Sequence, residues 1–508
     1  MIHTYFFKRF VFTFAVFLAC LPVFADDEFD DFSDFSDFEN FDSDAGSPSS
    51  PAAVAVSISG DISGGLMGFI DDFKTLDTFK GTNLSDIFSG NLNFAVKGGR
   101  ADAVINLALS PVFDGSSSPI QIDEAYLRAY FGPINLEAGL RKITWGKADS
   151  LGPLDVVNPL DYSDLSALSD IFSMKIARPM LHAVWNITDT AKLEVVFEPG
   201  FRGHKFSLTD RWAPAEITAL PGAILAFTDA KLSPLIDNFP NFDGPAYTTL
   251  MGRLQSGLNM DAVAKNYNAA SSFLNMEYAQ AGLRFTATLG GAVDLGLQYF
   301  YGNLFRPMVD LRGLYGIDNT VLLAALNKGD HSALYPVVHY NRYHQIGLDY
   351  AQVLAGFNLR SEIAVNITED LSGDDNAVTN PFIAWSLGFD RDLVWGINLN
   401  LQATETIRLL HDKVSAEPFL YGEEDKDITA TRLTVILSKK ILRDELELKT
   451  TGICDIEDKG FYIIPAIVWT RDDIQAELSA GVFGGDDSGE LGGYWKNSFI
   501  KTVLTFSF

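Results

Sequence analysis

The feature that most constrains this fold is a repeated pair of alternating segments joined by a short turn. From Ala279 to Leu289 every second residue is apolar, and a similar alternation follows Gly290-Gly291 and runs to Tyr301. A period of two is typical of a strand with one apolar and one polar face, and paired glycines are typical of a tight turn. The sequence therefore predicts a β-hairpin over residues 279–301.

The same unit recurs along most of the chain. Further hairpins are predicted at residues 92–109, 125–140, 181–197, 346–365, 385–401, 433–448 and 463–482. A first strand at 54–69 and a last strand at 499–508 bring the count to 18, or to 16 if the weak pair at 446–454 and 460–468 is miscounted. In the fifth of these further hairpins, 385–401, the turn is expected at Asp390 to Asp392, with Trp395 in the second strand.

The connections between these strands alternate in length. Turns inside the hairpins are a few residues long, whereas the connections between hairpins include residues 146–179, 201–273 and 305–339. Short turns on one rim and long loops on the other are typical of a transmembrane β-barrel, whose short turns face the periplasm. We therefore expect an all-β, antiparallel transmembrane barrel over residues 53–508, wide enough for a water-filled lumen.

Two of the long connections contain apolar, helix-like stretches, at residues 213–230 and 321–326. Loops of this length are usually functional or disordered. The sequence leaves open whether they fold into the barrel as a constriction or cap it from outside.

The first 25 residues have the pattern of a secretory signal. Lys8 and Arg9 precede an apolar run at 10–24, and Ala25 offers a small residue for cleavage. The run is short for a membrane-spanning helix. A second reading places cleavage before Cys20 with lipidation of that cysteine. Cleavage after Ala25 leaves Cys454 as the one cysteine, so no internal disulfide is expected.

Residues 26–52 form an acidic segment and a Ser/Pro linker. Between Asp26 and Asp44 there are ten acidic residues and no Lys or Arg, and Phe recurs at every third position from Phe29 to Phe41. A period of three suits neither a strand nor a helix, so we expect disorder. The segment is read either as a solvated tail or as a tether whose Phe side chains bind a periplasmic partner. The net charge of −28 argues against nucleic acid as a partner.

The last strand has an apolar face that includes Phe506 and Phe508, and the given sequence stops at an aromatic residue. Outer-membrane barrels resemble one another in this ending, which their assembly machinery recognises. The resemblance implies export to the outer membrane of a diderm bacterium. The expected partners are outer-membrane lipids, periplasmic chaperones and the barrel-assembly machinery, and a homo-oligomer is left open.

A short motif follows the second hairpin along the chain. Arg141-Lys142 precede Trp145-Gly146, and a second part places Asp155, Asn158, Pro159 and Asp161 in the pattern Asp-x-x-Asn-Pro-x-Asp. The motif resembles a porin-like family of bacterial outer-membrane barrels, many of unknown substrate. The resemblance implies a long loop folded toward the lumen and supplies no catalytic residue.

Read physically, Asn158-Pro159 initiates a turn that Asp155 and Asp161 cap, and Trp145 suits the membrane interface at the rim. The motif is interpreted mainly as a loop held in shape, with direct solute binding as the alternative.

Charged residues on the strands are expected to point into the lumen, because a charge facing lipid near the midplane costs about 2–4 kcal/mol. Mixed charges across a pore select among ions and small polar solutes. By alternation, the candidates for lining the pore are Glu124, Arg128, Glu137, Arg141, Glu194, Glu198, Arg284, Arg360, Glu362, Arg432 and Glu447.

No enzyme signature, cofactor motif or metal site is predicted. His339 and His344 fall on opposite faces of a strand end, and acidic clusters at 370–375, 423–427 and 486–490 are interpreted as solvated loops rather than Ca²⁺ sites. The leading hypothesis is a porin-like channel for passive diffusion of small polar or ionic solutes. The alternatives are a plugged transporter for hydrophobic or aromatic compounds and a surface adhesin or antigen that uses the long loops.

Overall fold

The structure is a computed structural model of the chain. It describes residues 54–70, 84–110, 120–208, 210–238, 241–257, 276–310, 317–330, 337–415, 420–423 and 426–508. The predicted signal at 1–25, its two cleavage readings and the acidic segment at 26–52 lie outside the described residues.

Eighteen long strands form one sheet. They are β1 (Ala55–Phe69), β2 (Leu84–Lys97), β3 (Ala101–Leu109), β4 (Ile120–Phe131), β5 (Ile134–Arg141), β7 (Arg178–Thr188), β8 (Ala191–Glu198), β10 (Gln280–Leu289), β11 (Val293–Asn303), β14 (Arg342–Leu354), β15 (Phe357–Thr368), β16 (Phe382–Leu393), β17 (Ile397–Arg408), β19 (Thr429–Ile441), β20 (Leu446–Asp455), β21 (Gly460–Arg471), β22 (Ile474–Gly484) and β23 (Phe499–Ser507).

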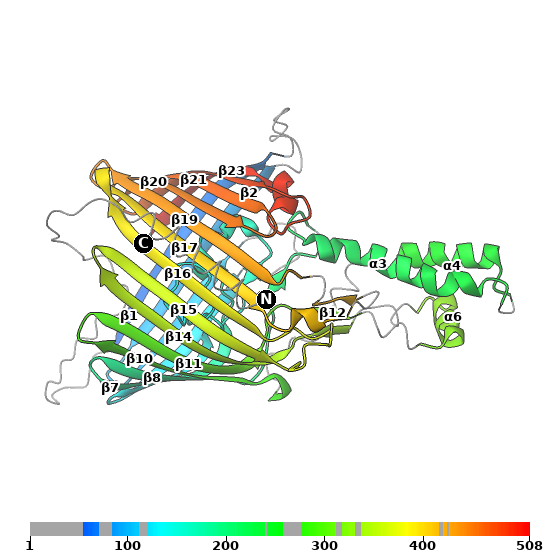
Figure 1. Ribbon diagram of the computed structural model, residues 1–508. Helices are drawn as coiled ribbons and strands as arrows, with labels where there is room; N and C mark the ends of the chain where they lie inside the picture. Colours follow the sequence, from blue (N-terminus) through cyan, green and yellow to red (C-terminus); the bar gives the residue numbers. More distant parts are fainter. Residues whose placement is uncertain are drawn as a thin grey trace. The chain divides into compact units, whose positions relative to one another are not determined.

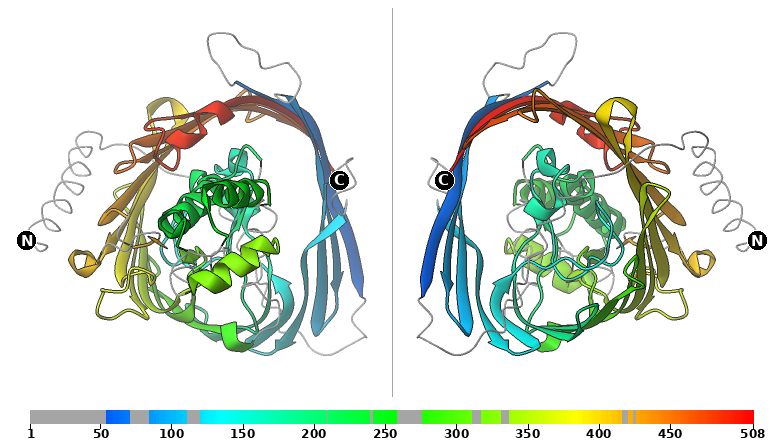
Figure 2. Two further views of the ribbon diagram at one scale, coloured as in Figure 1. Left: turned by 90° about the vertical axis from the view of Figure 1, so that its right-hand side faces the viewer. Right: turned by 90° about the vertical axis from the view of Figure 1, so that its left-hand side faces the viewer.

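The sheet closes on itself. Each long strand pairs antiparallel with the next long strand along the chain, and β1 pairs with β23 from Asp61↔Ser507 to Phe69↔Phe499. Figure 2 shows β1 in blue beside β23 in red where the ring closes. Closure leaves no sheet edge exposed, so every strand has a hydrogen-bonding neighbour on both sides. The predicted antiparallel barrel of 18 strands is confirmed.

The turns and loops sort to opposite rims as expected. The turn between β10 and β11 contains Gly290 and Gly291, both with positive φ (58° and 69°), which suits residues without a side chain. The turn expected at Asp390 to Asp392 is wrong. Strand β16 continues to Leu393, and Trp395 lies in the turn with φ 66° and not in the second strand. The charged residues Asp390 to Asp392 interrupt the apolar alternation and therefore suggested a turn, but they pair in register with Asn398 to Asn400 of β17.

The two faces of the wall differ in polarity. On β10, Leu283 points outward and is 44% exposed, whereas its neighbour Arg284 is 4% exposed. Near the short-turn rim the outer surface carries exposed aromatic side chains, as at the interface girdles of membrane barrels. These are Phe131, Trp185, Trp395, Trp469, Phe506 and Phe508.

Helices and small sheets belong to the connections at the other rim. The helices are α2 (Ile171–Met174), α3 (Ala215–Leu232), α4 (Gly244–Gly257) and α6 (Asn319–Asn327), with 3-10 turns at Leu165–Ala167, Ser233–Leu235, Met276–Tyr278, His411–Lys413 and Gly492–Asn497. One further 3-10 turn, Val394–Gly396, lies at the short-turn rim between β16 and β17. Short strands are β6 (Asp161–Tyr162), β9 (Lys205–Phe206), β12 (Met308–Asp310), β13 (Val337–His339) and β18 (Leu420–Tyr421). No helix in the described part of the chain is long and apolar enough to cross a membrane.

The predicted helical stretches correspond to α3 and α6, and α4 was not predicted. The three helices share an apolar core that includes Ile224, Phe227, Leu254 and Leu322, all nearly inaccessible to solvent. Figure 1 shows them projecting from the long-loop end of the barrel, away from the strands. These helices therefore extend the molecule beyond the barrel and do not enter its lumen.

Substituting Leu348 by Arg should destabilise the barrel in lipid. Leu348 lies in the middle of β14 and is 48% exposed on the outer face. An arginine there should lower the free energy of unfolding by about 2–4 kcal/mol, and Leu354→Arg, on the same outer face at the short-turn end of β14, by only about 0–1 kcal/mol. Equilibrium unfolding from phospholipid vesicles measures both. Equal losses for the two variants would contradict this assignment of membrane depth.

Candidate functional site: a loop held inside the barrel

The connection between β5 and β7, residues 142–177, lies inside the ring of strands. Its contacts reach the inner faces of β11, β14, β15 and β17, which lie farther around the ring, beyond β8 and β10. Figure 2, which looks along the barrel axis, shows coil in cyan and teal within the ring. A loop inside the lumen is what the family resemblance implied. We call residues 145–158 the lumen loop.

Four polar side chains from four strands bind the backbone of the lumen loop. Glu362 on β15 accepts hydrogen bonds from the backbone N–H groups of Lys147, Ala148 (2.7 Å) and Leu154 (3.2 Å). Gln402 on β17 accepts hydrogen bonds from the backbone N–H groups of Asp149 (2.9 Å) and Ser150 (3.1 Å).

The remaining two side chains are glutamines that donate to the loop. Gln298 on β11 donates to the Leu154 carbonyl at 3.0 Å, and Gln345 on β14 donates to the Pro153 carbonyl at 3.0 Å. Because backbone groups removed from water need partners, these four wall residues decide where the loop can lie. We call Gln298, Gln345, Glu362 and Gln402 the polar row.

The Trp-Gly pair of the motif fits the loop closely against the wall. Gly146 has φ +97° and lies against the Glu362 carboxylate, where a Cβ atom would collide with it. The Glu362 carboxylate also accepts from the next two N–H groups of the loop. Both the backbone conformation and the close approach therefore require glycine at this position.

Trp145 does not lie at the membrane interface, and that expectation is wrong. Its side chain is 2% exposed inside the barrel, edge-on to Phe300 with ring centroids 6.3 Å apart. It packs in an apolar cluster with Ile143, Val157 and Val196. The aromatic ring fixes the start of the lumen loop to the inner wall, where sequence reasoning had placed it outside because tryptophan is common at bilayer interfaces.

The second part of the motif ties the two ends of the connection together. Asn158 donates to the carbonyls of Arg141 (2.9 Å) and Ile176 (3.0 Å), and its side-chain oxygen accepts from the Ile143 N–H. Asp155 does not cap a turn at Asn158-Pro159: its carboxylate forms an ion pair with Lys175, at 2.7 Å. The Asp155–Lys175 pair is largely buried, and such a pair is strongly destabilising to break.

Asp161 and Pro159 complete this frame. Asp161 accepts from the backbone N–H of Ser163 at 2.9 Å and forms an ion pair with Lys205 in the next long connection. The carbonyl of Pro159 accepts from the N–H of Ile176 at 2.8 Å. These contacts describe a loop held in shape. Direct solute binding by the motif remains a prediction.

Five of the predicted pore-lining charges form one network on β4, β5 and β8. Glu137 lies at its centre, with Arg128 at 2.7 Å and Arg141 at 3.1 Å. Arg141 also reaches Glu124, at 3.4 Å. His182 joins the network by contacting Glu137 at 3.0 Å and Glu194 at 3.3 Å.

The other predicted charges lie at separate places on the inner wall. Arg284 forms a buried ion pair with Asp349 at 2.6 Å, and Glu198 accepts from the side chain of Gln280. Arg432 pairs with Asp455 at 2.6 Å. For Glu447, no ion pair or side-chain hydrogen bond is found among the residues that the structure describes.

Arg360 links the wall to the lumen loop. It pairs with Asp149 of the loop and with Asp390 of β16, the latter at 3.0 Å. Asn400 also donates to Asp149, at 2.9 Å. The loop edge therefore carries a trio of one cation and two carboxylates.

Sequence reasoning missed several of the residues that build this site. The glutamines of the polar row are uncharged, so a search for inward charges passed over them although alternation would have placed them inside. Asp149 was missed because it lies outside any strand. One carboxylate group of the described residues, Asp455 with Asp458 and Glu490, could gather metal ligands. Arg432 already contacts two of its members, at 2.6 and 3.8 Å, and so offsets the negative charge there.

Comparison with known proteins found neither a matching protein-family model nor a matching curated protein. Among solved structures, OccK9 of Pseudomonas aeruginosa is 8% identical with a TM-score of 0.45, covering 90% of this chain and 97% of that one. A BenF-like porin of Pseudomonas fluorescens is 7% identical with a TM-score of 0.46, covering 89% and 98%. The outer membrane channel DcaP of Acinetobacter baumannii is 10% identical with a TM-score of 0.38, covering 90% and 98%. These values are too low to support an inference about solutes.

Replacing Glu362 by Ala should release the lumen loop from the wall. The substitution leaves the N–H groups of Lys147, Ala148 and Leu154 without their acceptor. Hydrogen bonds to charged groups contribute about 1.5–3 kcal/mol each, so amide exchange over residues 147–154 should be faster by at least about tenfold. Hydrogen-exchange mass spectrometry measures this rate. Glu447→Ala is the matched control, and equal exchange in both variants would contradict the docking role.

The imidazole of His204 should make the stability of the loops depend on pH. His204 lies among Tyr162, Phe206 and Phe305, and its Nδ1 accepts from the Leu160 N–H at 2.9 Å. Burial, together with the positive charge of Arg306, lowers the pKa of His204 to about 3.

The unfolded chain binds a proton at His204 near pH 6.5, whereas the folded chain does not. The contribution of the neutral imidazole is therefore complete above this pH and is lost as the pH falls toward 3. In His204→Asn, which keeps an acceptor, the urea midpoint should fall less between pH 7 and pH 4.5 than in the unsubstituted protein. An equal fall in both proteins would refute the assignment.

Proposed function

We propose that this protein is a porin-like channel of an outer membrane that lets small polar or ionic solutes diffuse through a barrel narrowed by the lumen loop. The observation that carries the proposal is the docking of that loop on the polar row, inside a wall of inward charges. A polar interior keeps water in the lumen, and a loop held across it limits the size of what passes. The apolar outer surface and its aromatic rim support placement in a bilayer.

The charges at the loop edge support selectivity as well as size limitation. Asp149, Arg360 and Asp390 lie together where the loop meets the wall. A cluster of charges at the edge of a water-filled passage creates a local field that distinguishes solutes by charge and dipole.

Purified protein in a planar bilayer should give stepwise conductance. Glu362→Ala should raise the single-channel conductance, because the lumen loop loses three backbone hydrogen bonds to the wall. Ile346→Val, a small change on the outer face of β14, is the matched control. Electrical silence of both the unsubstituted protein and the Glu362→Ala variant would refute the channel.

Arg360→Ala should shift the channel toward cations. The substitution leaves the carboxylates of Asp149 and Asp390 without the guanidinium between them. The reversal potential under a KCl gradient should therefore move toward the potassium equilibrium potential. A shift toward chloride, or no shift, would show that this trio does not face the permeation path.

A plugged transporter for hydrophobic or aromatic compounds is the second candidate. It is favoured by an apolar cluster within the ring, in which Leu160, Leu168 and Trp212 from the connections pack against Phe69 and Phe499 of the wall. This candidate predicts a silent barrel that retains an apolar ligand through purification. Conductance together with a ligand-free preparation excludes it.

A further inference from the structure

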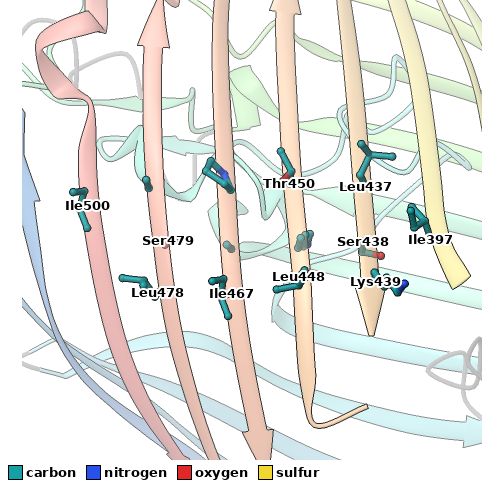
Figure 3. A pocket seen from close by; sticks show the side chains of 14 residues that line it. Ile397, Leu437, Ser438, Lys439, Leu448, Thr450, Ile467, Leu478, Ser479 and Ile500 are labelled. Carbon is teal, nitrogen blue, oxygen red and sulfur yellow. The ribbon is translucent and has the colours of Figure 1, made fainter. Parts of the chain in front are cut away.

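The outer face of the barrel has a hollow on the wall formed by β17 and β19 to β23. The groove has a volume of about 630 Å³. Figure 3 shows its labelled side chains spread over neighbouring strands, seen with the far wall of the barrel behind them. Its rim consists of large apolar side chains that are 40% to 53% exposed on the outer face, namely Leu437, Leu448, Ile467, Leu478 and Ile500.

The hollow follows from small residues at the centre of this wall. Pro465 on β21 faces outward opposite Thr450 of β20, and Ala480 of β22 lies on its other side. Proline has no N–H to donate to a neighbouring strand. The pairing of β21 with β22 runs from Ile463↔Val482 to Ala466↔Ser479 with no pair between them. Short side chains framed by leucine and isoleucine leave a depression that the strands themselves do not fill.

A cation lies at one end of this groove. Lys439 lines it, on the same face of β19 as Leu437, and pairs in register with Leu448. Figure 3 shows the Lys439 side chain beside Leu448. No ion pair of Lys439 is found within the described ranges. Since β19 ends at Ile441, the ammonium lies close to the short-turn rim, where a lysine on the lipid face can extend to the headgroup level.

We propose that this groove is a binding site for one anionic phospholipid of the leaflet on the short-turn side. An acyl chain would lie over Thr450, Pro465 and Ala480, and Lys439 would bind the phosphate. The proposal relies on the barrel spanning a bilayer, and it does not depend on whether the lumen conducts.

A lipid suits the site better than a second copy of this chain does. Within a bilayer there is no hydrophobic gain from bringing two apolar surfaces together, so association depends on close packing of their shapes. A neighbouring barrel presents a convex wall with its own projecting side chains, whereas a flexible acyl chain can fill a narrow depression. The lone ammonium at one end matches a single anionic headgroup.

Native mass spectrometry of the full chain in detergent, with added phosphatidylglycerol, tests the site. The probe for comparison is a galactosyl diacylglycerol with the same acyl chains and no charge. The unsubstituted protein should retain phosphatidylglycerol in preference to the galactolipid. Lys439→Ala should reduce retention of phosphatidylglycerol about fivefold, the effect of one basic residue at an anionic lipid, without changing retention of the galactolipid.

Lys440→Ala is the matched control, because Lys440 is the next residue on β19 and lies on the opposite face of the strand. It should leave retention of both lipids unchanged. Ala480→Leu fills the hollow and should reduce retention of both lipids. If this variant folds poorly, as shown by loss of the folded band on unheated gel electrophoresis, the comparison of Lys439→Ala with Lys440→Ala still decides the question.

Equal retention of phosphatidylglycerol by the Lys439→Ala and Lys440→Ala proteins would overturn the proposal. A dimer that Ala480→Leu abolishes, with lipid retention unchanged, would overturn it as well and would assign the groove to a second copy. A silent barrel in the conductance experiment combined with Lys439-dependent lipid retention would refute the channel and leave the lipid site standing.

Discussion

The pairing of β1 with β23 is the constraint on which the rest of this structure depends. In hydrocarbon no water replaces a missing backbone hydrogen bond, so a sheet is stable there only when its first and last strands meet. Nine paired positions, from Asp61↔Ser507 to Phe69↔Phe499, achieve this closure. Once the sheet is closed, alternation along each strand assigns every second side chain to lipid and the others to the interior, as Leu283 and Arg284 illustrate.

That assignment explains why the interior can bind a loop. Side chains that point inward do not contact lipid and so need not be apolar. Gln298, Gln345 and Glu362 can therefore lie side by side on neighbouring strands and bind backbone groups of the loop in place of water. In the loop, Gly146 lies where the wall comes closest, and Trp145 packs into an apolar part of the same wall. Wall and loop are thus complementary in both polarity and shape.

The barrel could be predicted from sequence because its strands have a short period and its turns carry local signals. All eight hairpins, both terminal strands and the sorting of the loops followed from these features. The site could not be predicted to the same depth. Alternation predicts that Glu362 faces inward. It cannot predict that the Glu362 carboxylate binds the N–H groups of Lys147 and Ala148, which are more than 200 residues away in sequence. Trp145 was misplaced for the same reason, since its partners come from distant strands.

The lumen loop also has a mechanical consequence. Its covalent ends are attached to β5 and β7, and its middle is hydrogen-bonded to β11, β14, β15 and β17 on other parts of the ring. A thin-walled cylinder of many strands resists stretching along its hydrogen bonds far better than it resists flattening. A loop that links β5 and β7 to four other strands by hydrogen bonds through the interior should oppose such flattening. We therefore expect the lumen loop also to stiffen the ring against the lateral pressure of a bilayer.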